Sequence, residues 1–273
     1  MCGIVGYAGD KKAINKILTG LKSLEYRGYD SAGIAYVKDN EIKIIKKAGP
    51  IKNLEENINY NEDTNIGISH TRWATHGVAN DINAHPHRQG KITLVHNGII
   101  ENYDELKKKL LKKGYIFKTG TDTEVATAVI DDIYNEEKDM IKVLNKITHI
   151  FKGSYAFNII NDDYKDVIFG IRKDSPLIVG IGNNENVLAS DIPAIVHITN
   201  KYVVLDNYDV VYLTKDSVKY YDREGREIQK EIKEFSSEKE TISKNGYDHF
   251  MLKEINEEPE LVKKLLNLYT ENN

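Results

Sequence analysis

The chain has 273 residues, of which 40% are hydrophobic and 29% are charged, a length that allows one large domain or two small ones. Its 38 Lys and Arg against 42 Asp and Glu leave a net charge of −4, which argues against nucleic acid as the main partner. Apolar runs stay well short of the roughly 18 to 20 residues that cross a bilayer, so we expect a soluble protein with no membrane partner. A single cysteine cannot form an internal disulfide and favours a reducing compartment, so we expect a cytoplasmic protein.

The first half of the chain alternates short apolar strands with amphipathic helices. Strands are expected at Ile4–Ala8, Ala32–Val37, Glu41–Lys46, Asn65–His70 and Lys91–His96. Helices are expected at Lys11–Leu24, Tyr103–Lys113, Asp122–Tyr134 and Met140–Ile150. Thr121 and Glu124 have the spacing of a capping box at the start of the third helix.

Beyond Gly153 the pattern changes to consecutive strands, with one short helical stretch at Ile192–His197. The strands are expected at Tyr155–Ile160, Val167–Arg172, Leu177–Gly182, Val187–Ala189, Tyr202–Leu205, Val210–Thr214, Val218–Tyr221 and Arg226–Ile232. Many strands, with the helices collected into blocks, predict an α+β domain of packed sheets flanked by helices.

The last forty residues differ from this body. Phe235–Gly246 is polar and charged and predicts a linker, and a final helical run is expected after Pro259. That run carries leucines and a valine at helical spacing, which need a partner surface. We therefore expect the chain to be a piece of something longer.

Cys2 is the first candidate for chemistry. A lone cysteine in a cytosolic chain is usually a small buried hydrophobic residue. Removal of Met1, which is common ahead of a small residue, would give Cys2 a free α-amine whose reference pKa of about 7.7 to 8.0 lets it accept the thiol proton. Nucleophile and base would then belong to one residue, and Gly3 and Gly6 would leave room beside it for a substrate.

The second candidate is the segment from His96 to Gly98. Asn-Gly alone is most often a hairpin turn. Here it stands between a strand and the apolar pair Ile99-Ile100, which weakens that interpretation. The Asn97 amide beside the Gly98 N–H would place two donors close together, as a developing oxyanion requires.

The third candidate is the segment from Ser69 to Gly77. Arg72 offers a planar fork for a carboxylate, and Thr75 and His76 add donors, so the segment suits an α-carboxylate. Asp122 could face a ligand ammonium, although helix capping explains its position nearly as well. The stretch from Arg27 to Gly33 reads as a tight glycine turn that is structural or braces the site.

Histidine raises a competing class. Five of the eight histidines lie between His70 and His96, and the pair His85 and His87 superficially resembles metal ligands. Pro86 between them would interrupt a ligand-bearing strand, and one cysteine provides no thiolate cluster. The metal amidohydrolase therefore stays a weaker alternative, which chelator sensitivity would separate from a cysteine enzyme.

Five ordered motifs together resemble the N-terminal nucleophile glutaminases, and within them the glutaminase half of the glutamine–fructose-6-phosphate aminotransferases. The motifs are Met1–Gly6, Tyr26–Gly33, His70–Gly77, His96–Asn102 and Thr121–Glu124. The resemblance covers about residues 2 to 259. The run from Thr71 to Gly77 favours this group over the amidophosphoribosyltransferases, which share the terminal cysteine.

The resemblance implies a four-layer αββα sandwich over a glutaminase domain at 2–240, with 241–273 a linker and the start of a sugar-phosphate isomerase domain. It implies that Cys2 is the nucleophile, that Asn97 and Gly98 are oxyanion donors, and that Arg27 is a structural support. It implies substrate binding by Arg72, Trp73, Thr75, His76 and Asp122. Trp73 would lie in a loop that closes over L-glutamine. No metal or other cofactor is implied.

The partners implied are L-glutamine, an isomerase domain that the sequence to Asn273 does not contain, and a second copy in a full-length homodimer. One departure is that the linker reads Glu257-Glu258-Pro259 where the family carries Glu-Gln-Pro. We expect hydrolysis of glutamine through a γ-glutamyl thioester, with the ammonia passing to fructose 6-phosphate in hexosamine biosynthesis. Two alternatives stay open, the glutaminase domain of another class II amidotransferase and an inactive module that retains Met1.

Overall fold

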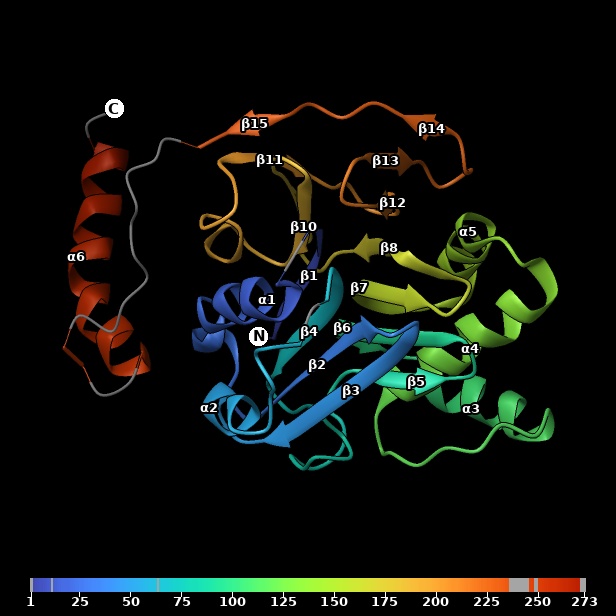
Figure 1. Ribbon diagram of the computed structural model, residues 1–273. Coiled ribbons are helices and arrows are strands. Elements are labelled where there is room, and N and C mark those ends of the chain that lie inside the picture. The colour runs from blue at the N-terminus through green and yellow to red at the C-terminus, as the bar shows by residue number, and fades with distance from the viewer. Residues whose placement is uncertain (1, 11, 63, 236–245, 248–249, 271–273) are drawn as a thin grey trace. The chain divides into compact units, whose positions relative to one another are not determined.

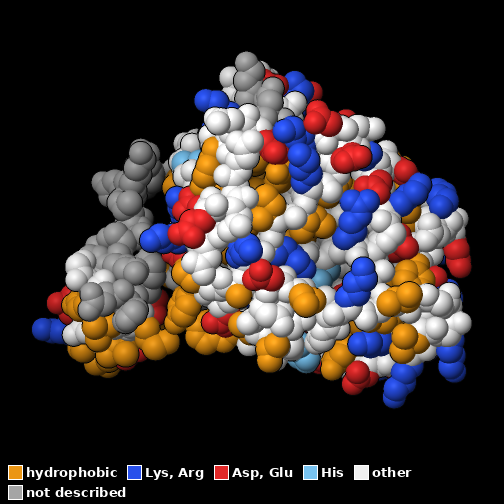
Figure 2. All heavy atoms as spheres, turned by 60° about the horizontal axis from the view of Figure 1, so that its bottom comes forward, with side chains coloured by type: hydrophobic (Ala, Val, Ile, Leu, Met, Phe, Trp, Pro, Cys, Tyr) orange, Lys and Arg blue, Asp and Glu red, His pale blue; other side chains and the backbone are white. Residues whose placement is uncertain are grey.

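The structure is a computed structural model that describes residues 2–10, 12–62, 64–235, 246–247 and 250–270 (Figure 1). The chain divides into two compact units, Met1–Ser237 and Glu238–Asn273. The expected domain boundary at 240, and most of the expected linker, lie outside the described residues. Among the residues described, no helix is long and apolar enough to cross a membrane. The face in Figure 2 carries basic and acidic side chains interspersed, in keeping with the small net charge.

Two antiparallel sheets form the first unit. In spatial order, the first sheet contains β15 (Lys233–Glu234), β11 (Lys201–Val204), β9 (Ile178–Ile181), β10 (Glu185–Ala189), β1 (Gly3–Gly9), β4 (Ile66–Arg72), β2 (Ser31–Lys38) and β3 (Glu41–Ala48). The second contains β14 (Glu227–Ile228), β13 (Val218–Tyr221), β12 (Val210–Leu213), β8 (Tyr164–Lys173), β7 (Gly153–Asn161), β6 (Ile92–Ile100) and β5 (His87–Gln89). The N-terminal strand β1 is therefore central, between β4 and β10.

Successive side chains of a strand point to opposite faces of its sheet, and the buried hydrophobic residues accordingly form three clusters. On β7, Phe157 and Ile159 face one side of the second sheet, and Ala156 and Ile160 face the other. Ala156 and Ile160 join residues of the first sheet, such as Ile4, in a cluster between the two sheets. The sheets therefore pack face to face through their inner surfaces.

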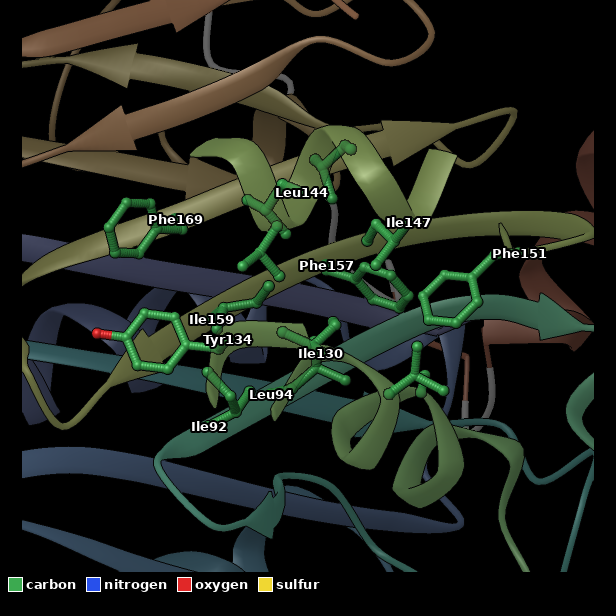
Figure 3. Packing of buried hydrophobic residues seen from close by; sticks show 14 of the residues in the cluster. Ile92, Leu94, Ile130, Tyr134, Leu144, Ile147, Phe151, Phe157, Ile159 and Phe169 are labelled. Carbon is green, nitrogen blue, oxygen red and sulfur yellow. The ribbon is translucent and has the colours of Figure 1, made fainter. Parts of the chain in front are cut away.

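Helices cover both outer faces. On the first sheet lie α1 (Ala13–Lys22) and α2 (Ile51–Glu55), and on the second lie α3 (Tyr103–Lys112), α4 (Asp122–Glu137) and α5 (Met140–Ile150). In Figure 3, Ile130 of α4 and Leu144 and Ile147 of α5 point toward Phe157 of β7. The layers are helix, sheet, sheet and helix, and the expected α+β, four-layer αββα architecture is confirmed.

Most predicted elements appear with ends shifted by a few residues. Helix α1 begins at Ala13 rather than Lys11, and the expected helix at 192–197 is a short 3-10 turn, Ile192–Ala194. The expected strand at 226–232 is wrong beyond Ile228, because only the first residues pair with β13 before the chain crosses to the first sheet as β15. The sequence analysis missed α2 and β5, which have five and three residues.

The second unit contains α6 (Phe250–Thr270). This helix begins nine residues before Pro259 and runs through it, whereas the sequence indicated a helix only after that proline. Its apolar side chains are exposed, including Leu261, Val262, Leu265, Leu266 and Leu268.

Candidate active site

Cys2 stands directly before the central strand β1 and touches the loop that follows β4. Gly3 pairs with Thr71, and this register brings the half-buried Cys2 beside Trp73. The Trp73 N–H donates to Cys2 Sγ over 3.2 Å, and the thiol donates to the Trp73 carbonyl over 3.6 Å. The only thiol of the chain is thus held at the start of the loop that the sequence singled out.

Burial raises the pKa of the Cys2 thiol above its ordinary value, although the Trp73 N–H and the positive charge of Arg72 act in the opposite direction. The thiol is therefore protonated near pH 7. A reaction that needs the thiolate must supply a base beside it.

Asn97 reaches Cys2 from the other sheet. Its side chain lies on β6, and Asn97 Nδ2 donates to the Cys2 carbonyl over 3.0 Å. Asn97 Oδ1 lies 3.0 Å from Nε2 of His70 on β4. The cysteine and an amide donor that are 95 residues apart in the chain therefore meet where the two sheets face each other.

Gly98 continues β6 and is not part of a hairpin turn, because β6 pairs with β7 without interruption from Ile92 to Ile100. It has φ +130°, and a Cβ there would lie 2.2 Å from the Ser154 carbonyl oxygen. The position therefore requires glycine. The residue is exposed, directly beside the buried Asn97.

The Arg72 guanidinium organises the loop after β4. It donates to the carbonyls of His76 and Gly77, the latter over 3.2 Å, and more weakly to that of Val78 over 3.5 Å. Asp30 anchors the start of the same loop by accepting from Ala74 N over 2.9 Å. Arg72 was predicted to bind a carboxylate. In this structure it is 4% exposed, and its guanidinium donates to carbonyls of its own loop instead.

The other loop residues predicted for the site are more accessible. Trp73 is 42% exposed and packs edge-on against Tyr29, with ring centroids 6.3 Å apart. His76 packs edge-on against Tyr103 at 5.4 Å. Thr75 is exposed, and within the described residues its side chain makes no hydrogen bond or ion pair.

Asp122 is buried at the start of α4, where its carboxylate accepts from Ile100 N over 2.8 Å. It therefore ties the helix to the end of β6, three residues beyond Asn97. The predicted cap at Thr121 is present, because its hydroxyl accepts from Glu124 N. Glu124 does not complete the reciprocal box, since it accepts from the N–H groups of Lys118 and Thr119.

Arg27 is linked to the N-terminal strand indirectly, through Asp191 and Ser190. It forms an ion pair with Asp191, whose carboxylate also accepts from the Tyr26 hydroxyl over 2.9 Å. The adjacent Ser190 Oγ accepts from Ile4 N over 3.1 Å. This chain of contacts ends two residues from Cys2.

The two small residues near the terminus do not make room for a substrate. A Cβ on Gly3 would lie 2.7 Å from Leu24 Cβ, and one on Gly6 would lie 2.6 Å from Asn158 Nδ2. Both glycines allow other parts of the protein to pack against β1. The sequence-based expectation of substrate space at these positions is therefore wrong.

The clustered histidines pack against one another behind the site. His85 stacks on His70 with centroids 4.2 Å apart, and it also contacts His87 and His96. Burial lowers the pKa of each, that of His70 to about 3, so all four are neutral near pH 7. Within the described part of the chain, no group of three or more His, Cys, Asp or Glu side chains could hold a metal ion.

Two contributors to the site were not assigned roles from the sequence. Asp30 and His70 both lie inside the quoted motifs, but their hydrogen bonds join residues 44 and 27 positions apart in the sequence, Asp30 to Ala74 and His70 to Asn97 of the other sheet. The sequence shows Asp30 before the strand at 32–37 and His70 two residues before Arg72. It does not show which residues these two side chains contact in the fold.

Comparison with known proteins identifies the kind of domain. Residues 70–197 match the family described as "Glutamine amidotransferase domain". The chain carries a glutamine amidotransferase domain. Glutamine–fructose-6-phosphate aminotransferases from Fusobacterium nucleatum and Thermococcus kodakarensis are each 47% identical, over 99% and 98% of this chain but only 45% of their own length. The chain thus spans about half the length of these relatives.

Solved structures support the fold of this amidotransferase domain. Glutamine phosphoribosylpyrophosphate amidotransferase from B. subtilis is 26% identical, with a TM-score of 0.70 over 81% of this chain and 49% of that chain. A glutamine aminotransferase class-II domain protein from Silicibacter pomeroyi is 12% identical, with a TM-score of 0.54 over 81% of this chain and 99% of its own. The N-terminal nucleophile type of sandwich, inferred from the sequence motifs, is confirmed.

Proposed function

We propose that this domain hydrolyses L-glutamine to L-glutamate and ammonia through a γ-glutamyl thioester on Cys2. The observation that carries the proposal is the meeting of Cys2 with the Asn97 amide, 3.0 Å from the Cys2 carbonyl. A thiol beside a preorganised amide donor suits acyl transfer from an amide. Similarity to amidotransferases on both the sequence and the fold level supports the choice of glutamine.

The reaction begins after removal of Met1, when the free amine of Cys2 takes the thiol proton. Because burial raises the pKa of the thiol, this internal base is needed near pH 7. The thiolate forms a bond to the side-chain carbonyl carbon of glutamine, and Asn97 and Gly98 donate to the resulting oxyanion. The terminal ammonium then protonates the departing NH2 group, and the C–N bond breaks to release ammonia.

Water completes the cycle by attacking the thioester. The terminal amine accepts a proton from the water, the C–S bond breaks, and glutamate leaves with the thiol restored. The same residue therefore provides the nucleophile and the proton carrier in both half-reactions.

The glutamine backbone groups would be held by the loop after β4 and by the start of α4. Arg72 would donate to the α-carboxylate in place of the loop carbonyls, and Asp122 would face the α-ammonium. Thr75 and His76 would add polar contacts, and Trp73 would cover the bound amino acid. The exposure of Trp73 and Thr75 leaves these side chains free to adjust as the loop closes.

The ammonia would be used by a second half of the enzyme. Relatives that this chain matches over about 45% of their length are named for amino transfer to fructose 6-phosphate with isomerisation. We therefore place glucosamine 6-phosphate synthesis downstream of this site, with a sugar-phosphate isomerase domain as partner and a homodimer as the assembly of the longer protein. The exposed apolar positions of α6 supply a surface for that partner.

A glutaminase assay tests the proposal. Protein whose Met1 has been removed should release glutamate and ammonia in equal amounts, and Cys2→Ser should release neither at a comparable rate. A chelator should leave the rate unchanged. Turnover that survives in Cys2→Ser, or that requires a metal, would eliminate the cysteine mechanism. Protein that retains Met1 should be inactive, and removal of Met1 should make it active.

A further inference from the structure

His70 is a buried side chain that contacts Asn97 at the end of its amide opposite to Cys2. It lies on β4, is fully buried, and places Nε2 3.0 Å from Asn97 Oδ1. We propose that His70 is a positioning residue that holds the Asn97 amide in the orientation required for oxyanion binding. This inference rests on the proposed function, in which Asn97 is an oxyanion donor.

The Cys2 carbonyl determines which way the amide faces. A carbonyl oxygen only accepts hydrogen bonds, so the amide group 3.0 Å from it must be the NH2. The Asn97 oxygen then faces His70, and a rotated amide would place two acceptors against each other at one contact. Because the oxygen also only accepts, His70 must carry its proton on Nε2.

The protonation of His70 suits this role. Burial lowers the pKa of His70 to about 3, so the ring stays neutral at any pH at which the enzyme would work. A neutral ring with its proton on Nε2 is a fixed donor. Accepting this bond at the oxygen polarises the amide and strengthens donation from its NH2.

The ring itself is held in place by packing. His85 stacks on His70 at 4.2 Å with an interplanar angle of 29°, and His85 in turn contacts His87 and His96. The histidine cluster, which resembled metal ligands in the sequence, thereby supports the back of the oxyanion site. An NH2 group has two hydrogens, and Cys2 uses one, so the second is available to an oxyanion.

Asn97 could in principle keep its orientation through Cys2 alone. With only the hydrogen bond to the half-buried Cys2 carbonyl, the Asn97 amide could still rotate about its side-chain bonds. The second hydrogen bond, to His70, fixes the opposite end of the amide. A misplacement of about 1 Å at a reacting centre can cost on the order of 100-fold in rate. Removing the His70 contact should therefore lower kcat by about 10- to 100-fold while changing KM little.

A double-mutant cycle tests the proposal in the mature protein with glutamine as the substrate. His70→Leu should lower kcat, and His70→Gln, whose amide nitrogen can take the place of Nε2, should recover most of the loss. In an Asn97→Ala background, His70→Leu should have no further effect on kcat, because the group it positions is gone. His197→Gln is the control for replacing a histidine away from Asn97, because His197 bonds the Lys16 carbonyl, and it should keep the parental kcat.

Parental kcat in a folded His70→Leu protein would overturn the proposal, and so would a double mutant that loses the product of both single effects. If His70→Leu does not fold, His70→Gln and His70→Asn carry the same test, because only the longer amide reaches the Asn97 oxygen. Equal kcat in those two variants would also overturn it. If Asn97→Ala alone keeps the parental kcat, the oxyanion assignment of the proposed function fails instead.

Discussion

Replacing Asn97 by alanine separates catalysis from folding at this site. The change removes the NH2 donor beside Cys2 and two hydrogen bonds, one to the Cys2 carbonyl and one from His70. Loss of one oxyanion donor typically lowers kcat by about 100- to 1000-fold, or about 2.7 to 4 kcal/mol. KM should change little, because the donor acts on charge that develops only in the transition state.

The same change has a predictable effect on stability. At about 1 kcal/mol for each hydrogen bond, the free energy of unfolding should fall by about 2 kcal/mol. For a domain of this size, that corresponds to a drop in Tm of roughly 4 to 8 °C. Thermal unfolding measured by circular dichroism should therefore show a folded protein at the temperature of the glutaminase assay.

Asn102→Ala is the matched control. The Asn102 side chain also makes two hydrogen bonds, donating to the Ile150 carbonyl over 2.9 Å and accepting from Lys152 N over 3.0 Å. It should lose similar stability and keep the parental kcat. An Asn97→Ala protein with normal kcat, or an equal loss of kcat in both variants, would refute the reasoning.

Further predictions concern Cys2, Arg72 and Asp191. In protein that retains Met1, alkylation of Cys2 by iodoacetamide should increase with pH and level off only above the ordinary thiol pKa of about 8.5, because burial raises this pKa; a plateau reached below pH 8 would contradict that. Arg72→Ala should raise KM for glutamine far more than for an analogue lacking the α-carboxylate, and equal increases would remove the assigned role. Asp191→Ala leaves the half-buried Arg27 without its ion pair and should lower the free energy of unfolding by about 1 to 3 kcal/mol in urea titrations, with unchanged stability as the contrary result.

Regular elements were predictable where a periodic pattern was long. Helix α5 has the predicted bounds, Met140–Ile150, because its apolar spacing and the Asp139 cap agree. The strand ending at Ile100 was predicted only to His96, since Asn-Gly ordinarily ends a strand. The pairing with β7 outweighs that local preference by adding backbone bonds on both sides of Gly98.

The sequence supplied candidate site residues but not the contacts between them. Motifs identified Cys2, Asn97 and Arg72, because nucleophile, amide donor and guanidinium have recognisable chemistry. The sequence could not show that Arg72 binds carbonyls of its own loop or that His70 bonds Asn97. The His70–Asn97 contact depends on strand register and on the packing of two sheets, which local sequence does not determine. The Arg72 contacts depend on how the loop after β4 folds back onto the guanidinium.

In the proposed mechanism the nucleophile is Cys2, the first residue of the mature chain. The most direct measurement is intact mass before and after treatment with a glutamine-like electrophile, followed by peptide mapping. We expect a mass lower by one methionine residue, then a single adduct on Cys2 whose formation glutamine slows and Cys2→Ala abolishes. A protein that hydrolyses glutamine while keeping Met1, or an adduct that maps to any other residue, would contradict the account.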